Sequence, residues 1–125
     1  MLEPSVTIQP NRFVLENQQH LNRVSGLFQA FRAIEKTMPI QIAYTFILIA
    51  THEGASIGDI ARLAGFSLST CSRHILDLGE FNRKKEPGYN LVETRINPLE
   101  LRAKTVHLTA LGRELLRKIV TTMKV

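Results

Sequence analysis

The sequence predicts one mainly α-helical domain that carries a short β-hairpin. Apolar residues recur at intervals of three and four in five successive segments, which is the spacing of amphipathic helices. Two short stretches with alternating apolar residues, 89–96 and 104–108, lie between the fourth and fifth segments and predict two adjacent strands. The 125 residues, of which 44% are hydrophobic and 22% charged, suffice for one core and exclude a disordered chain.

The N-terminal part predicts an extended arm followed by a long helix. Residues 1–12 hold two prolines and show no sustained periodicity, so we expect residues 13–125 to form the folded domain. A helix is predicted over 13–37, with an apolar stripe made by Leu21, Val24, Phe28 and Phe31. This stripe is wider than a small core requires, which indicates that the helix also packs against a second copy of the chain.

The ends of the next two helices are marked by proline, glycine and serine. Pro39 suits the first position of a second helix because its missing N–H would have no partner there. Residues 40–51 are apolar on nearly every side, which predicts a central buried helix with Gly54 as its C-terminal cap. Ser56 is the predicted N-cap of a third helix that Gly65 closes, and one short strand could precede it. The buried stripe of this third helix is predicted as Ile60, Leu63 and Ala64.

The fourth helix follows the third after a short turn and has two distinct faces. Ser67 or Ser69 is its expected N-cap, and Gly79 ends it. Its buried stripe is predicted as Leu68, Cys71, Ile75 and Leu78. Two short helices joined by a glycine-containing turn, the second rich in small polar residues, form the helix-turn-helix pattern of DNA-binding proteins.

The polar residues of the fourth helix, over 67–78, are the candidates for contact with DNA. An α-helix fits the major groove, small hydroxyls allow close approach to phosphates and base edges, and an arginine can pair with two acceptors of guanine. This predicted recognition helix contributes Ser67, Ser69, Thr70, Ser72, Arg73 and His74.

Positive charge is concentrated in the part of the chain that holds the hairpin and the last helix. The net charge is +5 overall, with +3 over residues 82–104 and +3 over 105–125. A cationic loop beside a recognition helix is suited to the neighbouring minor groove, which completes the winged-helix pattern. Thr109 is the expected N-cap of the last helix, whose apolar positions recur as far as Met123. We therefore expect a winged helix-turn-helix fold.

Two segments resemble the MarR family of winged-helix transcription regulators. They are SIGDIARLAGFSLSTCSRHILDL at 56–78 and NPLELRAKTVHLTALGRELL at 97–116, and the second is the more specific because it follows the wing pattern of the family. The resemblance implies that Arg102 is the wing-tip arginine that enters the minor groove, that Glu100 orients it, and that Arg73 is the arginine of the recognition helix. It also implies a homodimer on a pseudo-palindromic DNA site.

The sequence departs from the family pattern in the wing and after the recognition helix. Leu101 stands where many members have a further basic residue, and Asn97 and Glu100 replace aspartates. Extra residues between Glu80 and Tyr89 add candidate phosphate contacts at Arg83, Lys84 and Lys85. The candidate wing residues are Arg95, Glu100, Arg102 and Lys104.

Most family members end with a further dimerisation helix, whereas this sequence stops at Val125. We therefore expect the first and last helices to supply the dimer interface. Its predicted residues are Phe13, Leu21, Val24, Phe28, Leu116, Ile119, Val120 and Met123.

Other classes of site lack support in the sequence. A single cysteine excludes an intrachain disulfide and favours a reducing compartment, so we expect a cytoplasmic protein. With the resemblance to the MarR family, we expect it to be of bacterial or phage type. Cys71 itself lies on a predicted buried stripe and is expected to be a small core residue. No metal-ligand spacing, phosphate loop or catalytic arrangement stands out, so no enzyme, metal or cofactor is expected. The longest apolar run, 40–50, is too short to span a membrane.

Two functions remain open from the sequence. The first is a sequence-specific double-stranded DNA-binding transcription regulator, acting as a homodimeric repressor and with room for an unidentified small-molecule effector. The second is a winged-helix protein-interaction module, or an accessory of replication or partition complexes, that does not read bases.

Overall fold

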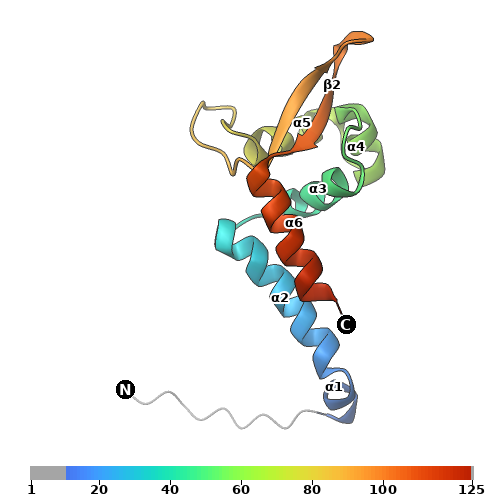
Figure 1. Ribbon diagram of the computed structural model, residues 1–125, viewed down its shortest axis with the longest axis vertical. Coiled ribbons are helices and arrows are strands. Elements are labelled where there is room, and N and C mark those ends of the chain that lie inside the picture. Colours follow the sequence, from blue (N-terminus) through green and yellow to red (C-terminus); the bar gives the residue numbers. More distant parts are fainter. Residues whose placement is uncertain (1–10, 125) are drawn as a thin grey trace.

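A computed structural model describes residues 11–124, with only the backbone of residues 101 and 102, and contains helices and one two-stranded antiparallel sheet (Figure 1). The elements in chain order are α1 (Arg12–Glu16), α2 (Gln18–Ile34), α3 (Ile40–Thr51), α4 (Ile57–Ala64), α5 (Leu68–Leu78), β1 (Val92–Asn97), β2 (Glu100–Leu108) and α6 (Ala110–Met123). The predicted mainly helical winged fold is confirmed. The predicted arm over 1–12 lies mostly outside the described residues, and its last residue already belongs to α1.

The single helix predicted over 13–37 is wrong in two respects. Asn17 interrupts it, because its side-chain amide donates to the carbonyl of Phe13 at 2.8 Å and its backbone N–H also bonds back into α1. Asparagine favours such local bonds over a continuous helix. The second helix then ends at Ile34 instead of continuing to 37, and Glu35 is extended.

Helices α2 and α6 lie side by side and run in opposite directions, and together they project from the rest of the molecule (Figure 1). Gly26 explains how closely they approach. A Cβ at this position would lie 2.5 Å from the Cγ2 atom of Thr122 on α6. A glycine in the middle of a helix costs about 1 kcal/mol relative to alanine, and here it allows the close packing of two helices.

Helix α3 is the centre of the core, as its sequence predicts. Phe46 and Ile49 are fully buried, and the ring of Phe31 on α2 packs edge-on against Phe46 with ring centroids 6.0 Å apart. Around α3 lie the buried residues Ile60, Cys71, Leu78, Leu91, Val92 and Val106. The prediction that Cys71 is a core residue is confirmed. Pro39 is the N-cap residue of α3 and thus precedes the position predicted for it, while the helix ends at Thr51, before Gly54.

The caps predicted for the helix-turn-helix are confirmed. The Oγ atom of Ser56 accepts from the N–H of Asp59 at 3.1 Å, and that of Ser67 accepts from Thr70 at 3.1 Å. Gly65 ends α4 with φ of 73°, a left-handed conformation that favours glycine. The buried stripes were partly wrong. Leu63 and Leu68 are exposed, because α4 turns Ile60 and Ala61 toward the core, and α5 turns Cys71, Ile75 and Leu78.

The hairpin is longer than its sequence pattern predicted. The strands pair from Val92 with Leu108 out to Ile96 with Lys104, so the residues predicted as a loop over 97–102 contain only a tight turn. β1 begins at Val92, three residues later than predicted, and ends one residue beyond the predicted strand, whereas β2 begins at Glu100, four residues before the predicted start at 104. The further strand considered before the third helix is a single bridge between Ser56 and Thr105.

Candidate nucleic-acid interface

Helix α5 presents a polar face opposite its buried side. Cys71, Ile75 and Leu78 face the core, which leaves Ser69 and Arg73 exposed and Ser72 half-buried on the other side. The hydroxyls at its start are connected to one another. The Ser67 Oγ atom lies 2.9 Å from Thr70 Oγ1 and 3.2 Å from Ser69 Oγ. These groups surround the N-terminus of a helix of eleven residues, where backbone N–H groups favour an anion.

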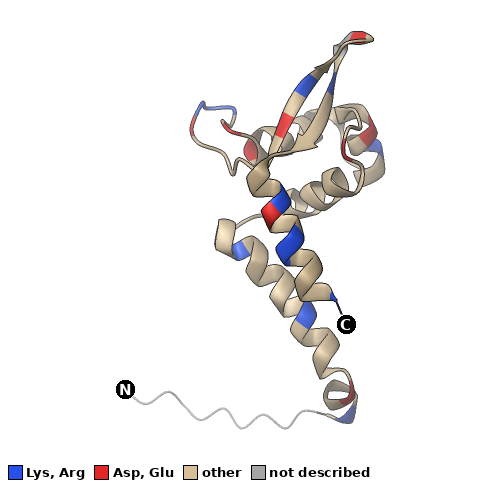
Figure 2. Cartoon of the chain, in the orientation of Figure 1, with Lys and Arg blue, Asp and Glu red and all other residues tan. Residues whose placement is uncertain are grey.

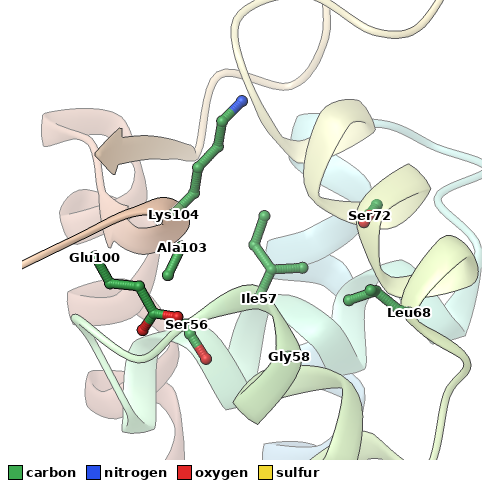
Figure 3. Close-up of a pocket in the computed structure, with 8 residues that line it drawn as sticks. All are labelled: Ser56, Ile57, Gly58, Leu68, Ser72, Glu100, Ala103 and Lys104. Atoms are coloured by element: carbon green, nitrogen blue, oxygen red, sulfur yellow. The ribbon is translucent and has the colours of Figure 1, made fainter. Parts of the chain in front are cut away.

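A cleft of about 410 Å³ lies between α5 and the hairpin (Figure 3). The start of α4, the outward side of α5 and strand β2 all contribute to it. Its lining residues are Ser56, Ile57, Gly58, Leu68, Ser72, Glu100, Ala103 and Lys104. The predicted recognition helix and the predicted wing are therefore two walls of one concave surface. Of the predicted contact residues, Ser72, Glu100 and Lys104 line it, whereas Ser67, Ser69, Thr70, Arg73 and Arg95 lie outside its lining.

His74 does not belong to this surface, contrary to the sequence-based prediction. Its ring faces α3, where Nδ1 lies 3.2 Å from the hydroxyl of the fully buried Thr45. The ring also packs edge-on against Phe66, with centroids 5.0 Å apart. Burial lowers the pKa of the His74 imidazole, and the carboxylate of Asp77 opposes part of this effect. His74 is thus a packing residue between α3 and α5.

The charged residues of the hairpin occupy different positions along it. Lys104 and Glu100 line the cleft, and the Glu100 side chain lies toward Ser56 (Figure 3). Arg95 is on β1, where its guanidinium pairs with Glu93 at 2.7 Å. The side chain of Arg102, and with it the predicted contact with Glu100, lies outside the described residues.

The residues inserted after α5 form a compact turn. The Oδ1 atom of Asn82 accepts hydrogen bonds from the N–H groups of Lys84 and Glu86, at 2.9 and 3.1 Å. Lys85 adopts a φ of 60°, and Phe81 forms a bridge with Pro87. Arg83, Lys84 and Lys85 are exposed at the tip. This loop projects away from both α4 and the hairpin tip (Figure 2), so its cations do not line the cleft.

Glu53 is an important residue that sequence reasoning missed. Its carboxylate accepts from the N–H of Leu108 and pairs with Arg113, both at 2.8 Å, so it joins the end of α3 to β2 and α6. The Leu108 hydrogen bond, reinforced by Arg113, lowers the pKa of Glu53, although burial acts in the opposite direction. No local pattern links residues 55 and 60 positions apart, so the sequence carried no signal for this contact.

The predicted dimer interface divides into exposed and buried positions. Six of the eight residues are exposed apolar side chains on α1, α2 and α6: Phe13, Leu21, Val24, Phe28, Val120 and Met123. Ile119 is wrong as an interface residue, because it is only 6% exposed and belongs to the protomer core. Leu116 is half-buried against that core. Leu15 and Ile40 are exposed apolar residues that the prediction left out.

No protein-family model and no curated protein sequence matches the chain. Solved structures do match. The Staphylococcus aureus MepR–DNA complex is 16% identical, with 88% of this chain and 80% of that chain covered and a TM-score of 0.66. The regulator Tm0710 of Thermotoga maritima is 17% identical, with 89% and 70% covered and a TM-score of 0.65. PcaV of Streptomyces coelicolor, in complex with its natural ligand, is 18% identical, with 98% and 78% covered and a TM-score of 0.54.

PcaV and Tm0710 are described as transcriptional regulators, and MepR was solved in complex with DNA. Within residues 11–124, no helix is long and apolar enough to cross a membrane. At this level of identity the match concerns the three-dimensional fold. The resemblance predicted from residues 56–78 and 97–116 is thus confirmed in structure: the chain has the winged helix-turn-helix fold of MarR-family regulators.

Proposed function

We propose that the protein is a sequence-specific transcription regulator that binds double-stranded DNA as a homodimer and acts as a repressor. The observation that carries this proposal is the cleft in which Leu68 and Ser72 of α5 face the same space as the hairpin. A recognition helix in a major groove and a wing in the adjacent minor groove require this arrangement.

Each proposed DNA contact follows from the chemistry of its side chain. Arg73 is exposed near the middle of α5 and is suited to two hydrogen bonds with guanine. Ser69 and Thr70, at the positive end of the helix, are suited to phosphate. The hairpin cations Lys104, Arg95 and Arg102 act in or beside the minor groove. The loop cations Arg83, Lys84 and Lys85 add sequence-independent attraction to the DNA backbone.

The exposed apolar residues of α1, α2 and α6 support a homodimer. Leu21, Val24 and Phe28 form a stripe on α2, and Val120 and Met123 are exposed at the end of α6. Contiguous apolar residues on a protein surface often mark an interface with another protein. A two-fold axis beside α2 and α6 would pair two recognition helices. The separation expected between them is one turn of DNA, about 34 Å.

A second cleft supports the proposal that a small molecule regulates binding. It has a volume of about 250 Å³, lies between α2 and α3, and is lined mainly by apolar side chains with Arg32 and Lys36 among them. Phe28 connects it to the proposed dimer face, so an occupant of this cleft could alter the spacing of the two recognition helices. PcaV has been solved with its natural ligand.

Selection from a random pool of DNA duplexes tests the proposal. The expected result is a pseudo-palindromic consensus with half-sites about ten base pairs apart. If the protein still binds DNA at low salt but repeated rounds of selection yield no consensus, the result would favour the protein-interaction or replication-accessory function instead.

We place the protein in the cytoplasm of a bacterium or of a phage-infected cell, because DNA and a reduced thiol are both found there.

A further inference from the structure

Leu68 is the most exposed apolar residue of α5. It occupies the first position of the helix, its exposed fraction is 59%, and it lines the cleft beside Ser72 (Figure 3). The core side of α5 is already filled by Cys71, Ile75 and Leu78, so packing within the protomer does not account for a leucine here.

Leu68 is part of an apolar patch inside an otherwise polar cleft. Ile57 at the start of α4 and Ala103 on β2 are half-buried and line the same space. Ser72, Lys104 and Glu100 surround this patch. On the proposed function, duplex DNA occupies the cleft, and the question is which group of DNA an exposed leucine would meet.

The major groove contains one apolar group that distinguishes bases, the C5-methyl group of thymine. A leucine placed against this methyl group buries apolar area on both sides of the contact. Against guanine, adenine or cytosine, the same leucine would cover donors or acceptors that then lack a hydrogen-bond partner. An exposed leucine on a recognition helix therefore selects for thymine.

We propose that Leu68 is a specificity-determining residue that contacts a thymine methyl group in each half-site of the operator. This inference rests on the proposed function. Arg73 is five residues further along α5, about 7.5 Å along the helix axis, and is expected to read guanine. Each half-site should thus combine a thymine and a guanine within a few base pairs.

The test replaces thymine by deoxyuridine, which removes the methyl group and leaves the pairing unchanged. The operator obtained by selection with the full chain is synthesised with each half-site thymine replaced in turn, and affinities are measured by fluorescence anisotropy. One replacement per half-site is expected to weaken wild-type binding by about 3- to 10-fold. The variant Leu68→Ala should bind the thymine and uracil operators within about two-fold of each other.

Leu63→Ala is the matched control. Leu63 is an exposed leucine on the neighbouring helix α4, with an exposed fraction of 49%, and it does not line the cleft. This variant should keep the wild-type sensitivity to uracil. Thermal unfolding checks that both variants are folded, and the uracil scan on the wild-type protein needs no variant.

The outcomes separate the inference from the function on which it rests. Failure to select any consensus would overturn both. A consensus in which every thymine can be replaced without loss of affinity would overturn the role of Leu68 alone. Equal uracil sensitivity of Leu68→Ala and the wild type would do the same, since the methyl contact would then be made by another residue.

Discussion

Thr45 and His74 form a polar contact at the edge of the core that requires a hydrogen on Nδ1 of the imidazole. The Thr45 hydroxyl, which is fully buried, donates its hydrogen to the carbonyl of Gln41 at 2.8 Å. It therefore accepts from His74, whose Nδ1 must carry the hydrogen. A second proton on the ring would place a charge against Phe66 and the apolar surface of α3, which is why burial lowers the pKa of His74.

The burial of His74 predicts a loss of stability in mildly acidic solution. Because the pKa of His74 is lower in the folded chain than its ordinary value of 6.5, the unfolded chain binds the proton first as the pH falls. The free energy of unfolding should therefore decrease from pH 7.5 to 5.5, and the decrease should be smaller in His74→Gln. Urea unfolding at these two pH values measures the difference.

The range from pH 7.5 to 8.5 provides the control for His74. The imidazole is neutral in both states there, so wild type and variant should show the same pH dependence. If the two proteins lose equal stability between pH 7.5 and 5.5, His74 is not the group responsible.

Arg73 and Lys84 are expected to differ in the kind of DNA contact they make. Arg73→Ala removes a base contact and should weaken operator binding by about 1–3 kcal/mol while relaxing the preference at one base pair. Lys84→Ala, in the exposed loop after α5, should weaken binding to all sequences alike and reduce the slope of affinity against salt by about one. Anisotropy titrations on operator and random duplex, at several salt concentrations, distinguish the two effects. Unchanged affinity in both variants would exclude this docking of α5.

At the scale of elements, the sequence predicted what depends on local chemistry. Helix caps at Ser56, Ser67 and Thr109 were found because their side chains bond to N–H groups three residues away. The start of β2, from Glu100, was missed because it is held by backbone pairing with the exposed end of β1 and not by burial. The position of His74 was missed because helical periodicity shows which residues of α5 share a face. It does not show which residue of another helix, here Thr45 on α3, will pack beside them.

The start of α6 provides a test of close packing between elements. Gly112 is buried, and a Cβ added to it would collide with the backbone carbonyl of Leu91, which also accepts from the N–H of Thr109 at 3.1 Å. Helix propensity alone predicts that Gly112→Ala gains about 1 kcal/mol. The collision predicts the opposite, a loss of about 1–3 kcal/mol.

Urea unfolding of Gly112→Ala decides between these two effects. Arg117→Ala, an exposed change on the same helix, should leave the free energy of unfolding within about 0.5 kcal/mol of the wild type. A Gly112→Ala variant that is more stable than the wild type would show that Leu91 and α6 are not so closely packed.

The whole molecule consists of a winged lobe and a projecting arm formed by α2 and α6 (Figure 1). The lobe has its own core around Phe46 and Ile49, whereas the arm leaves a long apolar stripe uncovered. The stripe contributes little to the stability of a single protomer. In the proposed homodimer, a second copy of the chain would cover it.

Introducing a charge into the stripe should separate the protomers. Val24 is 42% exposed on α2, so Val24→Glu is not expected to disturb the core of the protomer. In a dimer the same carboxylate would be buried without a partner, which is strongly unfavourable. Light scattering at tens of micromolar should give twice the chain mass for the wild type and the chain mass for the variant. A monomeric wild type would contradict the dimer.

The proposed binding mode requires that α5 and the hairpin form one surface that binds adjacent grooves of duplex DNA. Dimethyl sulfate interference on the selected operator tests it most directly, because the reagent methylates guanine N7 in the major groove and adenine N3 in the minor groove. Interference is expected at guanine N7 within each half-site and at adenine N3 immediately beside it. Interference in neither groove, or in the minor groove alone, would contradict the claim.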